Sequence, residues 1–193
     1  MPVIAIDGPV GSGKSTVARA VAARLDLDYL DTGAMYRAVA LGVVQRGLDV
    51  NQVPTEAIAE VAATTAIDPD DPELRGSAVG QIVSVVAAMP SVRMVLVERQ
   101  RAWLASRRGG VVDGRDIGTV VFPNADVKVY LTASEQERAR RRERDETAAD
   151  VARRDYLDST RAASPLTIAP DAVVIDTTSR TVDEIVDEIV GLL

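Results

Sequence analysis

The chain alternates between short apolar runs and longer stretches in which apolar residues recur at helical spacing. The apolar runs are typical of strands buried on both faces, and they cover 3–6, 27–30, 111–113, 125–131 and 172–176. The helical stretches cover 16–25, 34–46, 55–63, 77–88 and 91–107, and two more helices are expected after Ser134 and Thr181. Strands that alternate with helices pair in parallel, so the pattern predicts an α/β fold around a sheet of about five parallel strands.

Residues that begin or end helices mark several of these boundaries. Gly47 suits the C′ position of the second predicted helix, where a left-handed backbone commonly ends a helix. Ser134 with Glu137, and Thr181 with Glu184, have the spacing of a capping box. Both pairs therefore predict a helix start.

Residues 8–15 fit the pattern G-x-x-x-x-G-K-[ST] between the first predicted strand and the first predicted helix. In that context the backbone N–H groups of the loop surround a polyphosphate, Lys14 adds a positive charge, and Ser15 offers a hydroxyl to Mg²⁺. The alternative is a structural turn between strand and helix. The predicted ATP-binding residues of this segment are Gly8, Pro9, Val10, Gly11, Ser12, Gly13, Lys14, Ser15 and Thr16.

The carboxyl ends of the second and third strands carry further polar residues, and ligands of parallel sheets bind at that edge. Asp113 is placed to orient a magnesium-bound water, and Asp116 to accept hydrogen bonds from an acceptor substrate. Thr32 follows the second strand, and Arg37, one helical turn later, suits a second phosphate. The alternatives are a capped helix with a solvated arginine, and a surface turn in which Arg115 pairs with the two acids.

A polar stripe runs along the helix predicted over 77–88. Ser77, Gln81 and Ser84 share one face, and Arg93 follows shortly after the helix. Such a stripe is able to read the polar edge of a base. It is equally typical of the solvent face of an amphipathic helix.

Two groups of arginines follow the fourth strand. They are Arg138, Arg140, Arg141, Arg142 and Arg144, and then Arg153, Arg154 and Arg161. Arg154, Asp158 and Arg161 share one helical face, and residues 145–150 between the groups suit a cap or hinge. Two such arms are expected to close over a polyphosphate, neutralise charge and exclude water. The alternative is an exposed, salt-bridged helix pair.

The composition of the chain excludes several kinds of catalysis and binding. The 193 residues suit one domain, and the net charge of −7 argues against a general nucleic-acid surface. The chain contains no cysteine and no histidine, which excludes disulfides, thiolate catalysis and an imidazole base. The first strand begins at once and no apolar run approaches a membrane span, so a soluble, cytoplasmic protein that binds no membrane is expected.

Four segments together resemble the bacterial cytidylate kinases of the nucleoside-monophosphate kinase group. They are residues 4–9 with the phosphate loop, residues 30–37, residues 112–123, and residues 154–166. The resemblance implies a P-loop NTPase-type three-layer sandwich, a helical acceptor-binding arm and a lid. It also implies the transfer of phosphate from ATP to CMP or dCMP with Mg²⁺, by an enzyme expected to be a monomer.

The resemblance also implies roles for individual residues. Lys14, Arg154 and Arg161 match catalytic positions, Arg141 matches the residue beside the donor adenine, and Ser15 and Asp113 match metal positions. The positions that hold CMP are matched by Thr32, Arg37, Ser84, Arg93, Arg115, Asp116, Arg154 and Asp158.

The expected division of the single kinase domain follows from the same resemblance. The core comprises 1–47, 108–135 and 170–193, the arm about 48–107 and the lid about 136–165. Residues 67–73 contain two prolines and four acids, which predicts a loop or hinge without regular structure. The family usually has a larger insertion there and a longer lid, so we expect closure or acceptor affinity to differ.

Other functions are compatible with a phosphate loop alone. One alternative is another small-acceptor kinase, for thymidylate, shikimate or dephospho-coenzyme A. Another is a nucleotide-dependent switch or binding module, although the chain has no N-K-x-D motif to read guanine.

Overall fold

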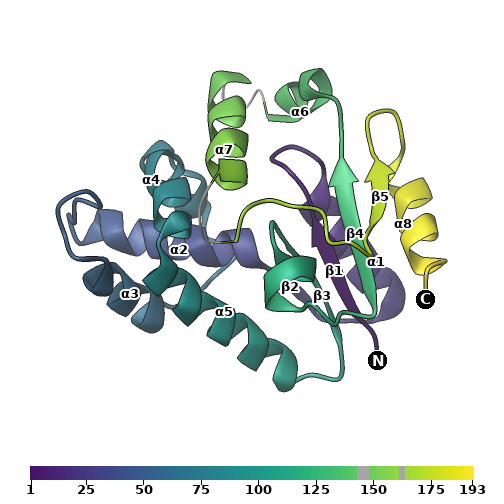
Figure 1. The fold of residues 1–193 in the computed structure, drawn as a ribbon, viewed down its shortest axis with the longest axis horizontal. Coiled ribbons are helices and arrows are strands. Elements are labelled where there is room, and N and C mark those ends of the chain that lie inside the picture. The colour runs from purple at the N-terminus through teal and green to yellow at the C-terminus, as the bar shows by residue number, and fades with distance from the viewer. Residues whose placement is uncertain (143–147, 161–163) are drawn as a thin grey trace. The chain divides into compact units, whose positions relative to one another are not determined.

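The computed structural model describes residues 1–142, 148–160 and 164–193 (Figure 1). The chain divides into two compact units, one made of Met1–Leu30 with Trp103–Leu193 and the other of Asp31–Ala102. The second unit begins earlier than the arm predicted from residue 48. It starts at Asp31 because the helix that follows packs against other helices of that unit.

Five strands form one sheet, as predicted. They are β1 (Val3–Asp7), β2 (Tyr29–Asp31), β3 (Gly110–Gly114), β4 (Val127–Thr132) and β5 (Val173–Asp176), in the order β2-β3-β1-β4-β5. Strand β1 lies parallel to both β3 and β4, and β4 lies parallel to β5. The α/β fold class and the parallel sheet are therefore confirmed. Strand β3 lies between β2 and β1 and is buried along its whole length, which explains why apolar residues precede Asp113 in this strand.

The helices of the first unit are α1 (Lys14–Leu25), α6 (Glu135–Arg142), α7 (Ala148–Thr160) and α8 (Val182–Val190). Helices α1 and α8 pack together and bury Val17, Val21, Ile185 and Ile189 against the sheet. The periodic apolar positions of both helices thus cover one hydrophobic core. The capping box of Thr181 and Glu184 is present as predicted.

The capping box predicted at Ser134 is only half formed. The Ser134 hydroxyl accepts a hydrogen bond from the Glu137 N–H at 3.3 Å, but the Ser134 N–H donates to Thr178 Oγ1 instead of to Glu137. The Glu137 carboxylate binds two arginines, Arg140 and Arg141. Charge-assisted hydrogen bonds to guanidinium groups are stronger than a hydrogen bond to one neutral N–H, so the Glu137 carboxylate binds the arginines and not the Ser134 N–H.

The second unit is helical. It contains α2 (Thr32–Gln45), α3 (Thr55–Thr64), α4 (Ser77–Ala88) and the start of α5 (Pro90–Ala105). Helix α2 packs against α3 and α4. Gly47 follows the end of α2 with a φ of 63°, which confirms its predicted place at C′. No single helix within the described ranges is long and apolar enough to cross a membrane, and α4 with α5 meets that test only as a pair bent by 91°.

The prediction that residues 67–73 lack regular structure is partly wrong. Its last two residues begin a 3₁₀ turn over Pro72–Arg75. Proline suits the first position of such a turn because its fixed φ is helical and no N–H is needed there. The carboxylate of Asp71 accepts the Glu73 N–H at 2.8 Å and caps the turn.

Candidate active site

The glycines of the phosphate loop have backbone conformations that other residues rarely adopt. Gly11 and Gly13 have φ values of 76° and 87°, and Gly13 directly precedes α1. A Cβ on Gly8 would lie 2.1 Å from the carbonyl oxygen of Leu131, at the end of β4. The loop is thus folded tightly at the N-terminus of a twelve-residue helix, where N–H groups and the helix dipole favour an anion.

Lys14 is buried within this loop. Its ammonium group donates to the carbonyl oxygen of Pro9 at 2.7 Å and lies 3.5 Å from the Ser12 hydroxyl. Burial lowers the pKa of Lys14 well below its ordinary value, and the charge of Arg115 lowers it further. A buried cation held by uncharged oxygens favours a bound anion beside it.

Ser15 and Asp113 lie together, as their predicted metal role requires. The Ser15 hydroxyl donates to Asp113 Oδ2 at 3.0 Å, and the Tyr29 hydroxyl donates to Oδ1 at 2.8 Å. A hydroxyl and a carboxylate are the oxygen donors that Mg²⁺ prefers, usually with phosphates and waters completing the shell. Among the described residues, no group of three His, Cys, Asp or Glu side chains is arranged to hold a metal. Tyr29 was not predicted, since a lone tyrosine in a strand gives no signal of this contact.

Helix α7 is tied to the end of β3 by an ion pair. Arg115 Nε donates to Asp158 Oδ2 at 2.8 Å, with 19% and 9% of the two side chains exposed. Burial opposes the charge of Arg115, but the carboxylate of Asp158 outweighs it and raises the pKa of the guanidinium. Asp116 follows directly and is buried. Three predicted acceptor-binding residues of the first unit therefore lie at one edge of the sheet.

Asp7 is a functional candidate that the sequence analysis missed. Its carboxylate accepts the N–H groups of Ile117 and Gly118, both at 2.8 Å. Burial raises its pKa to about 6 although these two hydrogen bonds work against the rise. Asp7 fixes the turn immediately after Asp116. Its position at the end of β1, next to Gly8, was the available signal.

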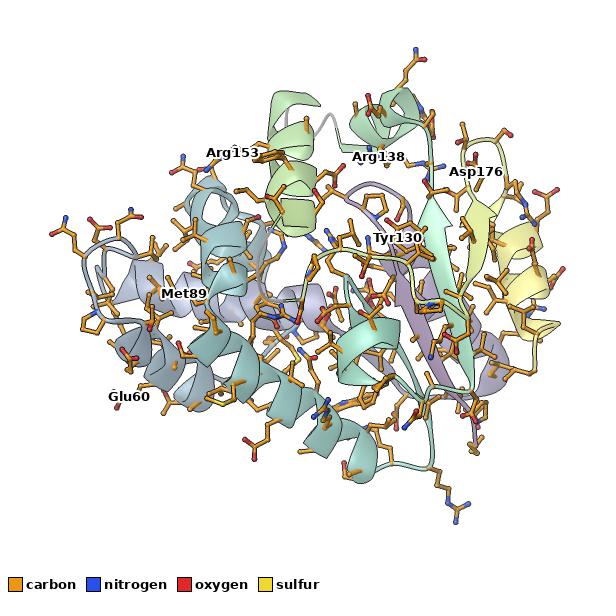
Figure 2. The ribbon with its side chains drawn as sticks, viewed as in Figure 1. Glu60, Met89, Tyr130, Arg138, Arg153 and Asp176 are labelled. Carbon is orange, nitrogen blue, oxygen red and sulfur yellow. The ribbon has the colours of Figure 1, made fainter. Side chains whose placement is uncertain are left out.

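Asp155 and Arg138 join helices α7 and α6 to the phosphate loop. Asp155 accepts the Val10 N–H at 3.0 Å, and Arg138 donates to the Val10 carbonyl oxygen at 3.1 Å and also pairs with Asp155. Figure 2 shows Arg138 close to the carboxyl end of β4, whereas Arg153 on α7 is exposed. Asp155 was not predicted as a site residue, because an acid between arginines on a helix reads as a surface charge.

Arg141 lies against the same loop, and its role beside the donor nucleotide stays a prediction. It donates to the carbonyl oxygen of Gly11, to Thr177 and to Glu137. Two predicted catalytic residues, Arg161 and the side chain of Arg154, lie outside the described part of the chain. Arg144 and residues 145–147 of the predicted hinge lie outside it as well, whereas residues 148–150 begin α7.

The second unit holds the remaining predicted acceptor residues. Arg37 Nη1 donates to the Leu74 carbonyl oxygen at 3.2 Å, and Thr32 is buried at the start of α2. Arg93 is buried, donates to the Ala87 carbonyl oxygen at 3.3 Å and lies 5.5 Å from the ring centre of Tyr36. Ser84 is also buried. Of the predicted polar stripe on α4, Ser77 and Gln81 are exposed, so the stripe is not one uniform surface.

Residues 4–193 match the sequence profile of the family described as cytidylate kinase. The chain is 47% identical to a cytidylate kinase of Nocardia farcinica, over 97% of this chain and 91% of that protein. It is 46% identical to a cytidylate kinase of Pelotomaculum thermopropionicum, over 98% and 95% of the two chains.

Two solved structures have a similar fold at low sequence identity. A gluconokinase from Sinorhizobium meliloti has a TM-score of 0.54 and 20% identity, covering 99% of this chain and 91% of that one. A shikimate kinase from Acinetobacter baumannii has a TM-score of 0.51 and 16% identity, covering 100% and 92%. These likenesses bear on the fold alone.

Proposed function

The chain belongs to the cytidylate kinase family, and we propose that it transfers the γ-phosphoryl group of ATP to CMP or dCMP, giving ADP and CDP or dCDP. The observation that supports this most strongly is the buried Lys14 in a phosphate loop whose next residue, Ser15, contacts Asp113. That arrangement provides a cation for the donor phosphates and oxygen donors for a metal at one point.

The donor site in this proposal is the loop from Gly8 to Thr16 together with Arg141. The N–H groups at the start of α1 bind the phosphates of ATP, and Lys14 moves from neutral oxygens to a phosphate oxygen. Ser15 and Asp113 would hold Mg²⁺ with the phosphates. The ion, when bound, neutralises charge on the phosphate oxygens of ATP.

The acceptor-binding residues expected from the sequence occur in both units, and each is given a proposed role. We propose that Arg37 binds the phosphate of CMP and that Thr32 assists it. Ser84, Arg93 and Asp116 bind the cytosine or its sugar, and Arg115, Arg154 and Asp158 complete the site. The burial of Ser84 and Arg93 supports this proposal, because ligand sites are typically apolar with a few buried polar side chains.

The chemistry needs no general base. A phosphate oxygen of CMP is already anionic near neutral pH, and it attacks the γ-phosphorus while the bond to the β–γ bridging oxygen breaks. Lys14, Arg154 and Arg161 are proposed to stabilise the charge on the transferred group. This scheme agrees with a chain that contains no histidine.

We further propose that the core, arm and lid expected from the sequence act as one monomeric kinase in the cytoplasm, where its substrates ATP and CMP are present. Nucleic acids and membranes have no role in this reaction.

A panel of acceptors tests the proposal. ADP release is measured with ATP, Mg²⁺ and each of CMP, dCMP, UMP and AMP, and binding of the same nucleotides is measured by isothermal titration calorimetry. We expect the highest kcat/KM with CMP or dCMP. Preference for a non-cytidine acceptor would overturn the assignment, and rapid ATP hydrolysis without any acceptor would instead favour a switch.

A further inference from the structure

The guanidinium group of Arg141 is held in its own plane by its neighbours. Its Nε donates to Glu137 Oε1 at 2.8 Å. Its Nη1 donates to Thr177 Oγ1 at 2.9 Å and more weakly to the Gly11 carbonyl oxygen at 3.4 Å. Its Nη2 donates to the Thr177 carbonyl oxygen at 2.8 Å. Each of the three nitrogens therefore already has an acceptor.

Thr177 is a rigid support for this contact. Only 2% of its surface is exposed, and its N–H donates to the Thr132 carbonyl oxygen at 2.8 Å. Its hydroxyl lies 3.0 Å from the carbonyl oxygens of both Ser12 and Thr132. The hydroxyl can donate its proton to one of these while it accepts from Arg141. Thr177 thus links the end of β4, the phosphate loop and α6.

Glu137 holds the other end of the guanidinium group. Its hydrogen bonds with Arg140 and Arg141 lower its pKa to about 2, so the carboxylate is ionised at neutral pH. Arg140 binds it through two nitrogens, at 2.8 and 2.7 Å. The carboxylate is therefore fixed on both sides, and the orientation of Arg141 is fixed with it.

An arginine whose plane is held in this way offers a ligand its flat face. A fork of hydrogen bonds to a phosphate would require it to give up its present acceptors. The face of a guanidinium, in contrast, stacks on an aromatic ring without using any in-plane donor. The Arg141 side chain keeps 25% of its surface exposed, and its Nη1 lies 3.5 Å from where a Cβ on Gly13 would be. The side chain is thus partly accessible, and its Nη1 lies beside the phosphate loop.

We propose that Glu137 and Thr177 are positioning residues that hold Arg141 flat, so that it contacts the purine base of ATP through its face and not the phosphates. The inference rests on the proposed function, in which ATP is the donor. Neither residue is expected to touch the reacting atoms. Their effect is on ATP binding alone.

Steady-state kinetics of Glu137→Gln and Thr177→Val tests this inference. Each variant is expected to raise the KM for ATP by about 3- to 5-fold, the size of one such stacking contact, with kcat and the KM for CMP unchanged. Thr177→Ser keeps the hydroxyl and is expected to restore the wild-type KM. Glu188→Gln on α8 and Thr64→Val on α3 are matched controls with no proposed role at the nucleotide site, and they are expected to have no effect.

Binding of inorganic tripolyphosphate, which has no base, distinguishes a contact of Arg141 with the purine base from a contact with the phosphates. Calorimetry is expected to show that Glu137→Gln weakens ATP but leaves tripolyphosphate unchanged. Equal weakening of both ligands would mean that Arg141 binds phosphate, and the inference would be wrong. An unchanged KM for ATP in Glu137→Gln overturns it as well, and this variant on a polar helix decides the matter even if Thr177→Val does not fold.

The KM for ATP of a double variant tests whether Glu137 acts through Arg141. If Glu137 acts through Arg141, Glu137→Gln adds no further increase to the KM for ATP in an Arg141→Met background. An additive increase contradicts the inference. If the wild-type protein does not phosphorylate CMP, the proposed function is overturned. The binding measurements with ATP and tripolyphosphate still test the role of Glu137 in that case.

Discussion

The Ser15 hydroxyl donates a 3.0 Å hydrogen bond to the carboxylate of Asp113, although 98 residues separate the two in the chain. Strands β1 and β3 are parallel neighbours in which Ile6 pairs with Asp113. The carboxyl end of β3 therefore lies beside the loop that follows β1. This pairing makes one oxygen site from two distant segments.

Removal of the Asp113 charge tests that site. Asp113→Asn is expected to increase the Mg²⁺ concentration needed for half-maximal activity by about 10-fold or more, because a neutral amide is a weaker ligand for a hard cation than a carboxylate. A magnesium titration of initial rates at saturating nucleotide measures this. Tyr29→Phe removes the hydrogen bond that the Tyr29 hydroxyl donates to Asp113 and is expected to cause a smaller change. An equal magnesium requirement in Asp113→Asn and the wild type would contradict the metal role.

Loss of the Lys14 ammonium is expected to reduce kcat by about 10²- to 10³-fold, the effect of removing one preorganised charge from a phosphoryl-transfer site. Lys14→Ala also removes a buried cation whose pKa is lowered by burial, so the folded state is expected to persist. Rates are compared with thermal melts of the same protein. Lys128→Ala changes the only other lysine in the sequence, which pairs with Asp171 at 2.8 Å, and should leave kcat unaltered.

Arg37→Ala is expected to raise the KM for CMP by about 10-fold or more and to leave the KM for ATP unchanged, because a guanidinium is replaced by a methyl group at the proposed acceptor phosphate. Full kinetics with both substrates varied measure the two constants. Arg46→Ala is the control at the end of the same helix, where Arg46 donates to the carbonyl oxygen of Gly42. Unaltered acceptor kinetics in Arg37→Ala would show that the second phosphate lies elsewhere.

The pKa of Asp7 predicts a defined pH dependence of stability. Burial raises this pKa from 3.8 to about 6, so the folded state holds a proton that the unfolded state releases between those values. The resulting stabilisation is complete below pH 3.8 and is lost as the pH rises through about 6. The shift corresponds to about 3 kcal/mol of unfolding free energy.

Asp7→Asn removes this titration. Urea denaturation from pH 4 to pH 7 measures the unfolding free energy of the wild type and of Asp7→Asn. We expect the wild type to gain stability relative to Asp7→Asn as the pH falls. Parallel curves for the two proteins would rule out a raised pKa for Asp7. The contributions of carboxylates remote from Asp7 cancel in the difference between the two proteins, which therefore reports on Asp7 and on its electrostatic interactions with Asp116 and Lys14.

Much of the site was predictable because its residues occur in contiguous segments. The loop from Gly8 to Ser15 carries its own geometry, since its glycines permit the backbone to turn and its lysine follows at a fixed distance. Asp113 and Asp116 were predicted as site residues because one lies at the carboxyl end of a buried strand and the other follows it, and their roles stay predictions. The capping box at Ser134 was predicted incorrectly because the Ser134 N–H donates to Thr178, 44 residues away, and the Glu137 carboxylate binds Arg140 and Arg141 instead.

The amino-acid sequence by itself determined the order of strands and helices, the parallel sheet and the phosphate loop, because each depends on the spacing of residues within a short segment. Only the tertiary structure decided which partner each polar side chain found. Asp7 holds a turn 110 residues away, Asp155 reaches the Val10 N–H, and Thr177 supports Arg141. A carboxylate or guanidinium has many acceptable partners in a sequence, and the packing of distant elements determines which of them lies within hydrogen-bond distance.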